Sequence, residues 1–350
     1  MILPPWPMLA YDLPDEELEV FLKSPEWGME HKRDGKRMLV RLTSVLKPPE
    51  AFSRTRKGLA MPEVIRDALM ASKCLSLVSK KDFFLDGELV WLDKNGRDHR
   101  TQVQAGGKSA KPVYAVWDIV LPKISYVKRK ALLMELCKVN GWYGNACVQY
   151  QSLYVTEESK KKIFKKGKKD RWEGYVFKEL AGKYIPGARD FRRWKYTVTD
   201  DYIVVGFTKS DKAKNPFRAL VLAQYDKKGN LVRKGQCGGG FPDKKDKTTK
   251  MTRTEIYEKF LKGKKCWLTS KEGVISAPPW QPLQAAHDFT DKDYGKTYKT
   301  INWLTKKDWF VIEVKSQGLT EYFIPYMAQN QGIRDNDDKL PKDCIASETT

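Results

Sequence analysis

Apolar residues recur at about every second position on both sides of Asp34-Gly35, within residues 27–42. Alternation of this kind is typical of β-strands, and an Asp-Gly pair is a strong turn signal. The pattern therefore predicts two strands joined by a tight turn, as in a β-hairpin. Similar patterns predict further strands in this half of the chain at residues 83–92, 113–120, 148–155, 172–178 and 194–207.

Helical patterns in the first half are fewer. Residues 128–139 carry apolar side chains at helical spacing, and Pro62 begins a helical stretch that extends to about residue 71. A short helix is expected after Pro14, where three acidic residues suit a first helical turn. Residues 157–169 are a very basic helix or loop, and the Pro-rich N-terminus predicts an extended arm packed on the first domain.

The second half, from about residue 200, has a different pattern. Residues 252–261 form its one good helical segment, and short apolar segments predict strands at residues 219–225, 231–237, 265–268 and 309–314. Several strands with a single helix are typical of a small barrel that binds nucleic acid. Residues 263–308 are longer than such a barrel needs, and the tail after Pro341 is expected to be loosely ordered.

Charge supports a polyanionic partner. The 350 residues contain 65 Lys and Arg against 44 Asp and Glu, which gives a net charge of +21. The basic residues recur from end to end, with 11 Trp and 16 Tyr among them. This distribution favours a protein that holds nucleic acid over a wide surface, and a merely solubilising basic surface is the alternative. The length indicates two domains, or three.

Cysteine and histidine usage gives no sign of a zinc site. The six cysteines include no Cys-x-x-Cys pair and the three histidines are isolated, so free thiols in a reducing cytosol are expected. No stretch approaches the 18 uncharged residues of a membrane span, and the apolar N-terminus lacks the basic start of a signal peptide. We therefore expect a cytoplasmic protein without a membrane partner.

Lys32 is the candidate nucleophile. It begins a Lys-x-Asp-Gly segment and lies close in sequence to Arg33, Lys36 and Arg37. Burial and cationic neighbours lower the pKa of a lysine and free its lone pair, and the same cations can hold phosphates. The functional interpretation is an amine that attacks the α-phosphorus of a nucleotide. The alternative, a basic turn whose lysine faces water, is favoured for this short segment alone.

Charged residues also interrupt the predicted strands. Glu88, Asp118 and Glu173 lie within or at the end of apolar strands, and Arg193 and Lys195 alternate so that both face one side. Buried charges are costly unless they meet counter-charges or a ligand. A nucleotide with Mg²⁺ satisfies both signs, since carboxylates bind the metal and cations bind phosphates. The order of these segments along the chain carries the hypothesis, because each alone is weak.

In this order the segments resemble the motifs of ATP-dependent DNA ligases of the covalent nucleotidyltransferase superfamily, in the compact form typical of phages and viruses. The matching segments of the first half are Pro7-Met8-Leu9-Ala10, Lys32-Arg33-Asp34-Gly35, Ser53-Arg54, Leu85-Asp86-Gly87-Glu88-Leu89, Val116-Trp117-Asp118-Ile119 and Glu173-Gly174-Tyr175-Val176-Phe177-Lys178. Those of the second half are Gly235-Gln236-Cys237-Gly238-Gly239-Gly240-Phe241, Val311-Ile312-Glu313-Val314 and Ile333-Arg334-Asp335-Asn336-Asp337-Asp338-Lys339-Leu340-Pro341.

Two matches depart from the family pattern. The Lys-x-Lys strand of the family appears as Arg193-Trp194-Lys195, and a register that uses Lys195 and Thr197 is the alternative. The Arg-x-Asp-Lys motif is stretched, so that it runs from Arg334 to Lys339.

The resemblance implies an α+β fold in two domains. Residues 1–199 would form a nucleotidyltransferase (adenylation) domain of antiparallel sheets with helices, and residues 200–350 an OB-fold β-barrel. The implied cofactors are ATP, carried as AMP on Lys32, and Mg²⁺, with Mn²⁺ as an alternative metal. The implied partner is nicked or broken duplex DNA, bound by a monomer in a bacterial or phage-infected cytoplasm.

The resemblance also implies roles for individual residues. Lys32, Lys178 and Lys195 would be catalytic, and Glu88 and Glu173 would bind the metal. The nucleotide would contact Glu30, Lys32, Arg37, Arg54, Glu88, Trp117, Glu173, Lys178, Arg193, Lys195, Arg334 and Lys339. DNA would contact the barrel and the basic cluster of Lys160, Lys161, Lys162, Lys165, Lys166, Lys168 and Lys169.

Three other functions fit parts of the same pattern. An RNA ligase and an mRNA capping guanylyltransferase share the first domain of this superfamily. Three features favour the DNA ligase: Ser53-Arg54, the residues from Gly238 to Phe241, and the Pro7-Met8-Leu9-Ala10 segment. A catalytically inactive DNA-binding clamp is the non-enzymatic alternative, and the intact Glu88 and Glu173 argue against it.

Overall fold

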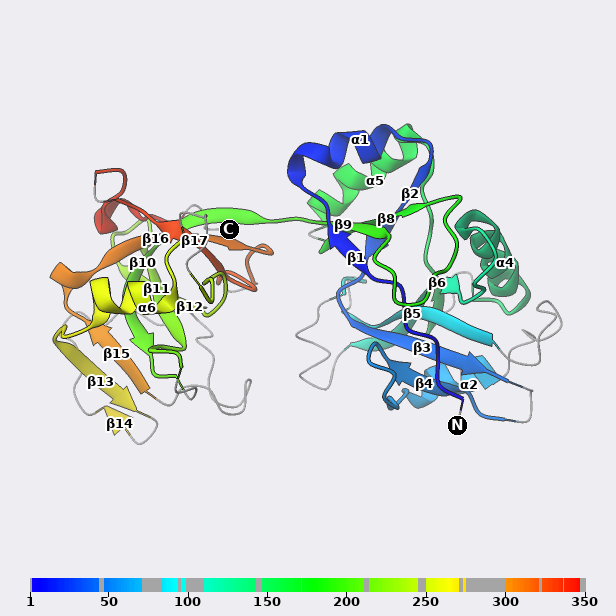
Figure 1. Cartoon of the computed structure of the whole chain (residues 1–350), viewed down its shortest axis with the longest axis horizontal. Helices are drawn as coiled ribbons and strands as arrows, with labels where there is room; N and C mark the ends of the chain where they lie inside the picture. Colours follow the sequence, from blue (N-terminus) through cyan, green and yellow to red (C-terminus); the bar gives the residue numbers. More distant parts are fainter. Residues whose placement is uncertain are drawn as a thin grey trace. The chain divides into compact units, whose positions relative to one another are not determined.

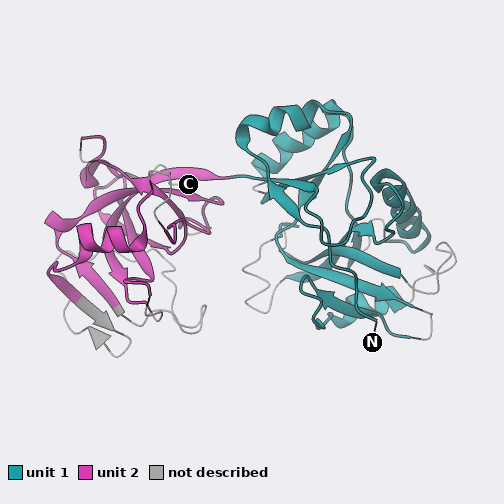
Figure 2. Ribbon diagram, in the orientation of Figure 1, with its two compact units in different colours: residues 1–196 teal, residues 197–350 magenta. Residues whose placement is uncertain are grey.

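The computed structural model divides into two compact units, residues 1–196 and residues 197–350 (Figure 2). The structure describes residues 2–43, 47–70, 83–93, 96–98, 110–142, 147–170, 172–210, 214–244, 250–270, 273–274, 300–320, 323–335 and 337–346. One cysteine, Cys74, two histidines, His99 and His287, and Asn336 of the stretched motif lie outside these ranges.

Unit 1 contains two sheets (Figure 1). The five-stranded sheet has the order β4 (Glu50–Ser53), β3 (Lys36–Leu42), β5 (Phe83–Leu92), β6 (Lys111–Ile119) and β7 (Val148–Tyr150). The four-stranded sheet has the order β1 (Ala10–Asp12), β9 (Phe191–Lys195), β8 (Gly174–Glu179) and β2 (Trp27–Lys32). The predicted antiparallel sheets are in fact mixed, because β6 pairs with β7, and β1 with β9, in parallel. A parallel pair needs a long connection between its strands, and a local pattern does not reveal it.

Helices cover both sheets of unit 1. Apolar side chains of α2 (Glu63–Met70) and α4 (Tyr126–Val139) share one core with the five-stranded sheet. Those of α1 (Leu18–Lys23) and α5 (Glu157–Lys169) share another with the four-stranded sheet. The basic residues 157–169 are therefore helical, with Thr156 as N-cap and acidic residues in the first turn. Among the helices of the described residues, none has the length and apolar character needed to cross a membrane.

The segment around Lys32 does not form the predicted hairpin. Strand β2 pairs with β8 in one sheet, whereas β3 pairs with β4 and β5 in the other. Residues 33–35 therefore carry the chain from the first sheet to the second. A Cβ atom on Gly35 would lie 2.4 Å from the carbonyl oxygen of Leu89, so this passage requires glycine.

A small apolar cluster joins the two sheets. It contains Met8, Val120, Tyr184 and Phe191, all buried, with Phe84 packed against it. Met8 belongs to the N-terminal arm, whose Leu9 N–H donates to the carbonyl of Ala188. The expected packing of this arm on the first domain is confirmed at these residues.

Unit 2 is built around one long strand, β10 (Val198–Thr208). The predicted single strand over residues 194–207 is wrong, because β9 ends at Lys195 and β10 begins in the second unit. The first part of β10 pairs with β16 (Phe310–Ser316), and the last part with β11 (Ala219–Tyr225) and β15 (Thr300–Leu304). The sheet continues through β12 (Leu231–Cys237), β13 (Cys266–Ser270), β14 (Gly273–Val274) and β17 (Gln329–Ile333). The predicted helix is α6 (Arg253–Ile256) followed by a π-helical turn at Tyr257–Leu261.

The ladders of unit 2 do not close into the predicted barrel among the described residues. The two outer strands β12 and β17 are linked near their ends by a single bridge between Gly239 and Gln329. The Asn330 N–H donates a hydrogen bond of 3.0 Å to the Gly239 carbonyl oxygen. The tail is better ordered than expected, since Cys344 is buried and the Ala346 N–H donates to the Tyr225 carbonyl.

Candidate active site

Lys32, Glu173 and Lys195 meet at one end of the four-stranded sheet. Gly174 on β8 pairs with Lys32 on β2 and with Lys195 on β9, so all three strands align at this row. The Glu173 carboxylate accepts from Lys32 Nζ at 2.5 Å through one oxygen and lies 3.0 Å from Lys195 Nζ through the other. A Cβ atom on Gly174 would lie 2.0 Å from the Trp194 carbonyl oxygen, and its φ is +153°. Glycine therefore allows the close approach that brings both lysines to one carboxylate.

Arg37 and Glu88 lie opposite each other on β3 and β5 of the other sheet. Arg37 donates twice to the Asp86 carboxylate, at 2.9 and 2.6 Å, and once to the Met8 carbonyl at 2.6 Å. These three hydrogen bonds hold the Arg37 guanidinium in place, and they use some of its N–H donors. Burial opposes the charge of Arg37, but the paired Asp86 outweighs it and the pKa of Arg37 is raised.

Glu88 differs from the other acids of the site. Burial raises the pKa of the Glu88 carboxyl to about 8, although Lys32 and Arg37 act in the opposite direction. No described residue forms an ion pair with it. Mg²⁺ characteristically takes one or two carboxylates together with phosphate oxygens, so an unpaired Glu88 with Glu173 nearby suits this cation. The described residues contain no group of three or more His, Cys, Asp or Glu arranged to hold a metal by themselves.

The raised pKa of Glu88 predicts a pH effect on stability. Its value in the unfolded chain is near 4.5, so between pH 4.5 and about 8 the folded protein retains a proton that the unfolded chain has lost. The free energy of unfolding contributed by Glu88 should therefore fall as pH rises through this window. Denaturant unfolding of the wild type and of Glu88→Gln at several pH values measures this difference. Parallel pH profiles for the two proteins would contradict the assignment.

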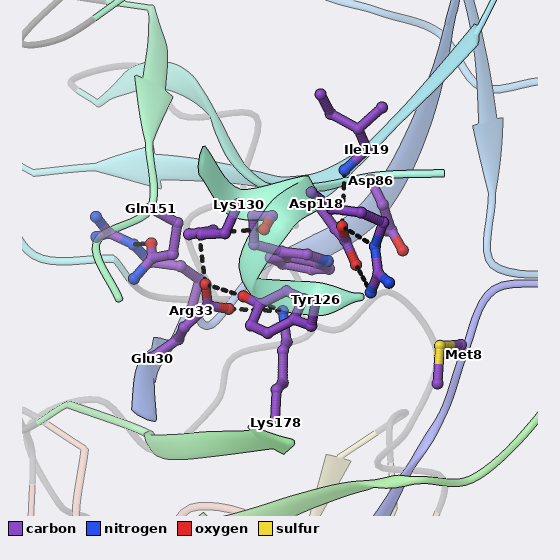
Figure 3. Close-up of polar contacts among 12 residues, drawn as sticks. Met8, Glu30, Arg33, Asp86, Asp118, Ile119, Tyr126, Lys130, Gln151 and Lys178 are labelled. Carbon is purple, nitrogen blue, oxygen red and sulfur yellow. Dashed lines mark hydrogen bonds and ion pairs between the residues drawn. The ribbon is translucent and has the colours of Figure 1, made fainter. Parts of the chain in front are cut away.

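Glu30 lies on β2, two residues before Lys32, in a fully enclosed cluster (Figure 3). Its carboxylate accepts from Tyr126 Oη at 2.6 Å, from Lys130 Nζ at 2.5 Å and from Lys178 Nζ at 2.6 Å. Burial opposes ionisation of Glu30, but the two lysines outweigh it and its pKa is lowered. Glu30 is thus a partner of the predicted catalytic residue Lys178.

Tyr126 and Lys130 were not predicted as site residues. Both lie on α4 at positions i and i+4, so they share one face of the helix. The sequence signal was this polar face beside the apolar one. The signal did not show that the polar face meets Glu30, which lies about 100 positions away in the sequence. The same helix supplies Arg129, which binds the buried Asp118 carboxylate through two donors at 2.8 and 3.0 Å. Asp118 therefore holds α4 on the sheet, and its acid side chain is occupied.

Two cations of the site lie close to the ring of Trp117. The Arg37 guanidinium carbon is 5.6 Å from the centroid of the Trp117 ring, and Lys178 Nζ is 5.4 Å from it. Attraction between cations and an aromatic face extends to about 6 Å. Through these two contacts, Trp117 links the Glu30 cluster to the Arg37 pair, and the residue is partly exposed.

Two further arginines of unit 1 bring positive charge to the site. Arg193 donates to both oxygens of Asp12, at 2.5 and 3.0 Å. Arg54 is exposed, and its pKa is lowered by burial of part of its side chain and then by Arg37, Arg189 and Arg193. The mutual repulsion of these cations indicates a place where an anion would be stabilised.

The remaining predicted residues, Arg334 and Lys339, lie in unit 2. Arg334 donates to Asp201 at 2.9 Å and to Glu313 at 2.6 Å, and Lys339 Nζ is 4.0 Å from the same Asp201. The stretched motif thus brings its two cations to a single carboxylate, despite its unusual spacing.

The basic cluster on α5 is only partly available to DNA. Lys160 is fully buried, and its ammonium donates to the carbonyls of Phe21, Ser24 and Trp27. Lys161 is paired with Glu19 and Glu157. The lysines that stay exposed are Lys162, Lys165, Lys166, Lys168 and Lys169.

Comparison with known proteins places the first unit in a family. The family model described as ATP dependent DNA ligase domain matches residues 7–196, more than half of the chain. The multifunctional non-homologous end joining protein LigD of Pseudomonas aeruginosa is 25% identical over 240 residues, which cover 64% of this chain and 27% of that protein. The corresponding repair protein of Mycobacterium tuberculosis is 23% identical over 228 residues, with coverages of 64% and 28%.

The chain thus spans about a quarter of the length of these relatives. A solved structure from a study of Lig E DNA ligases has a similar fold, with a TM-score of 0.54 and 14% identity over 93% of this chain and 99% of that one. Because the family match spans both sheets and every described residue of the Lys32 and Glu30 clusters, the chain belongs to the family of ATP-dependent DNA ligases.

Proposed function

We propose that this chain seals breaks in duplex DNA between a 5′-phosphate and a 3′-hydroxyl, through AMP carried on Lys32. The observation that best supports this proposal is the Glu173 carboxylate shared between Lys32 and Lys195, with Glu88 close enough for Lys32 and Glu173 to act on its pKa. A nucleophile, a second cation and two acids are thereby available at one point, as transfer of a phosphoryl group requires.

In the first step Lys32 Nζ attacks the α-phosphorus of ATP. A P–N bond forms, the bond to the β-phosphate oxygen breaks, and pyrophosphate leaves. Glu173 is hydrogen-bonded to Lys32 Nζ and can hold the proton that the amine loses. Lys195 and Arg37 stabilise negative charge on the α-phosphate. Mg²⁺ or Mn²⁺ held by Glu88 and Glu173 would neutralise phosphate charge further.

The next two steps pass AMP to the DNA and release it. An oxygen of the 5′-phosphate attacks the AMP phosphorus, the P–N bond breaks, and Lys32 regains its proton. The 3′-hydroxyl then attacks the 5′-phosphate, the new phosphodiester forms, and AMP leaves. Arg54 and Arg193 are the cations proposed to hold these phosphates, whereas Trp117 would contact adenine. Glu30 is enclosed and its carboxylate accepts from Tyr126, Lys130 and Lys178, so we propose that it holds Lys178 in place.

We propose that residues 1–199 act as the adenylation domain and residues 200–350 as an OB-fold that holds DNA. The bridge between Gly239 and Gln329, which joins the outer strands of unit 2, supports an OB-like arrangement. We also propose that the chain acts as a monomer; its net charge of +21 supports binding to the duplex largely through the phosphates.

The test is incubation with labelled ATP or labelled GTP, followed by denaturing electrophoresis and a joining assay on nicked duplex. We expect covalent label from ATP alone, and joining of DNA but not of an equivalent RNA nick. Label from GTP would favour the capping reaction, and preferential RNA joining would favour an RNA ligase. Absence of any label would leave the non-enzymatic clamp.

Arg334 and Lys339 are proposed to orient the departing pyrophosphate. The double variant Arg334→Ala with Lys339→Ala should slow self-adenylation about 100-fold, which corresponds to about 2.7 kcal/mol. It should spare joining of a pre-adenylated nick in the absence of ATP, because that step has no pyrophosphate. Equal loss of both reactions would instead assign these residues to folding of unit 2, where they bind Asp201.

A further inference from the structure

A pocket of about 570 Å³ lies in unit 1 beside the Lys32 turn, and none of the residues assigned above to nucleotide binding lines it. Successive side chains of a strand face opposite sides, so His31 on β2 and Arg33 directly after it point away from the side on which Glu30 lies. The pocket lies on the side of His31 and Arg33. Its walls come from four separate parts of the chain. These parts contribute His31 and Arg33, then Arg97, then Tyr150 and Tyr154, and last Trp172.

The pocket is built to hold negative charge. Its lining includes Arg33, Arg97 and Lys166 against one acid, Asp170, which is already hydrogen-bonded to Lys166. Arg33 also lies 3.7 Å from the Asp98 carboxylate, which is not part of the lining. Arg33 is fixed in place, because its Nε donates to Gln151 at 3.0 Å (Figure 3). Arg97 and Lys166 are exposed, so Arg33 is the fixed member of the three cations. Cations gathered at one pocket suit the binding of phosphate.

His31 supplies a second, independent sign of a ligand. Its ring is stacked on Trp172 with centroids 3.8 Å apart, and the residue is only 6% exposed. Its Nε2 has no hydrogen-bond partner, and the nearest acid oxygen, on Asp98, is 4.0 Å away, beyond hydrogen-bond length. Buried polar atoms are normally satisfied, and no described residue satisfies this one, so it is available to a ligand group bound beside His31.

The size and position of the pocket favour a nucleotide of the DNA strand. Its volume exceeds that of a bare phosphate, and three aromatic rings line it. Lys162, Lys165, Lys166 and Lys169 share one face of α5, so a basic stripe leads into the pocket. Such a stripe suits a polyanion better than a single small nucleotide. We propose, on the basis of the proposed ligase function, that this pocket binds one phosphate-bearing nucleotide of the DNA close to the break.

The test compares two double variants that remove the same charge. Arg97→Gln with Lys166→Gln alters the pocket, and Lys128→Gln with Lys138→Gln removes two exposed lysines of α4. Affinity for a fluorescent nicked duplex is measured over a range of salt concentrations. We expect the pocket variant to bind about tenfold more weakly, with a salt slope shallower by about two, and the control to change less than about twofold.

Two further measurements separate the possible sources of the ligand. Abasic sites are scanned along both flanks of the nick, and we expect one position that weakens wild-type binding about threefold or more but does not affect the pocket variant. Binding of a second equivalent of ATP to the adenylated enzyme is measured by calorimetry. A second site that disappears in the pocket variant, with DNA binding unaltered, would assign the pocket to a free nucleotide and overturn the proposal.

Equal DNA affinity of wild type and pocket variant would also overturn it. Labelling by ATP is measured in parallel and is expected to stay within about twofold in both variants, since neither alters Lys32, Glu88 or Glu173. Failure of this inference with intact ATP labelling and nick joining leaves the proposed function standing. Failure of the wild type to become labelled or to join nicks would instead reject the function itself.

Discussion

Replacing Lys32 by alanine should abolish covalent labelling by ATP. The amine is the proposed attacking atom, and Lys195, which remains on the same Glu173 carboxylate, lies one strand further away from β2. Removal of a nucleophile leaves no route to the covalent intermediate, so the loss should reach the detection limit, at least about 1,000-fold. The measurement is transfer of label from α-labelled ATP, read by denaturing electrophoresis.

The matched control is Lys36→Ala, which removes an exposed lysine at the far side of the same turn. It should become labelled at a rate within about threefold of the wild type. Lys32 is partly exposed at the end of its strand, so Lys32→Ala should keep the fold and its affinity for nicked duplex. If Lys32→Ala still becomes labelled, Lys32 is not the site of AMP attachment.

Replacing Glu173 by glutamine should slow self-adenylation about 100-fold or more. Glu173 contacts both lysines at 2.5 and 3.0 Å, and its neutral amide can neither hold the lysine proton nor share a negative charge between them. A loss of this size corresponds to about 2.7 kcal/mol of transition-state stabilisation, which is ordinary for one charged group of a phosphoryl-transfer site. Single-turnover labelling at saturating ATP measures it.

Glu179→Gln is the control for this change, because Glu179 lies at the exposed end of the same strand β8. Its labelling rate should match that of the wild type. A rate for Glu173→Gln within about threefold of the control would show that Glu173 only positions the lysines. Thermal unfolding of both variants, compared with the wild type, excludes loss of the fold as the cause.

Local sequence patterns predicted where strands begin and end better than they predicted which strands pair. Strand β5 has the predicted bounds 83–92, because alternation and β-branched or aromatic side chains are local properties. The hairpin at Asp34-Gly35 was wrong, because the same local pattern fits a turn between strands of two different sheets. Pairing depends on contacts between residues far apart in the sequence, which alternation does not specify.

The candidate site shows the same division. The order of motifs brought Lys32, Glu88, Glu173 and Lys195 to attention, and the structure places Lys32, Glu173 and Lys195 in direct contact. The partners of Glu30 could not be predicted, since they lie on α4 and a helical pattern shows which side chains share a face but not what that face meets. Arg129 and Asp118 were missed as a pair for the same reason.

The passage of the chain between two sheets at residues 33–35 has a mechanical consequence. Lys32 and Glu173 belong to one layer of unit 1, whereas Arg37 and Glu88 belong to the other. Residues 33–35 and the cluster of Met8, Val120, Tyr184 and Phe191 connect these layers close to the reacting groups, together with the contact between Glu30 and Lys130. The alignment of the Lys32 amine with the Glu88 carboxyl therefore depends on how the two layers are stacked. Phe191→Ala would leave a void in this cluster and let the layers shift. It would thereby slow catalysis without removing any group that touches ATP.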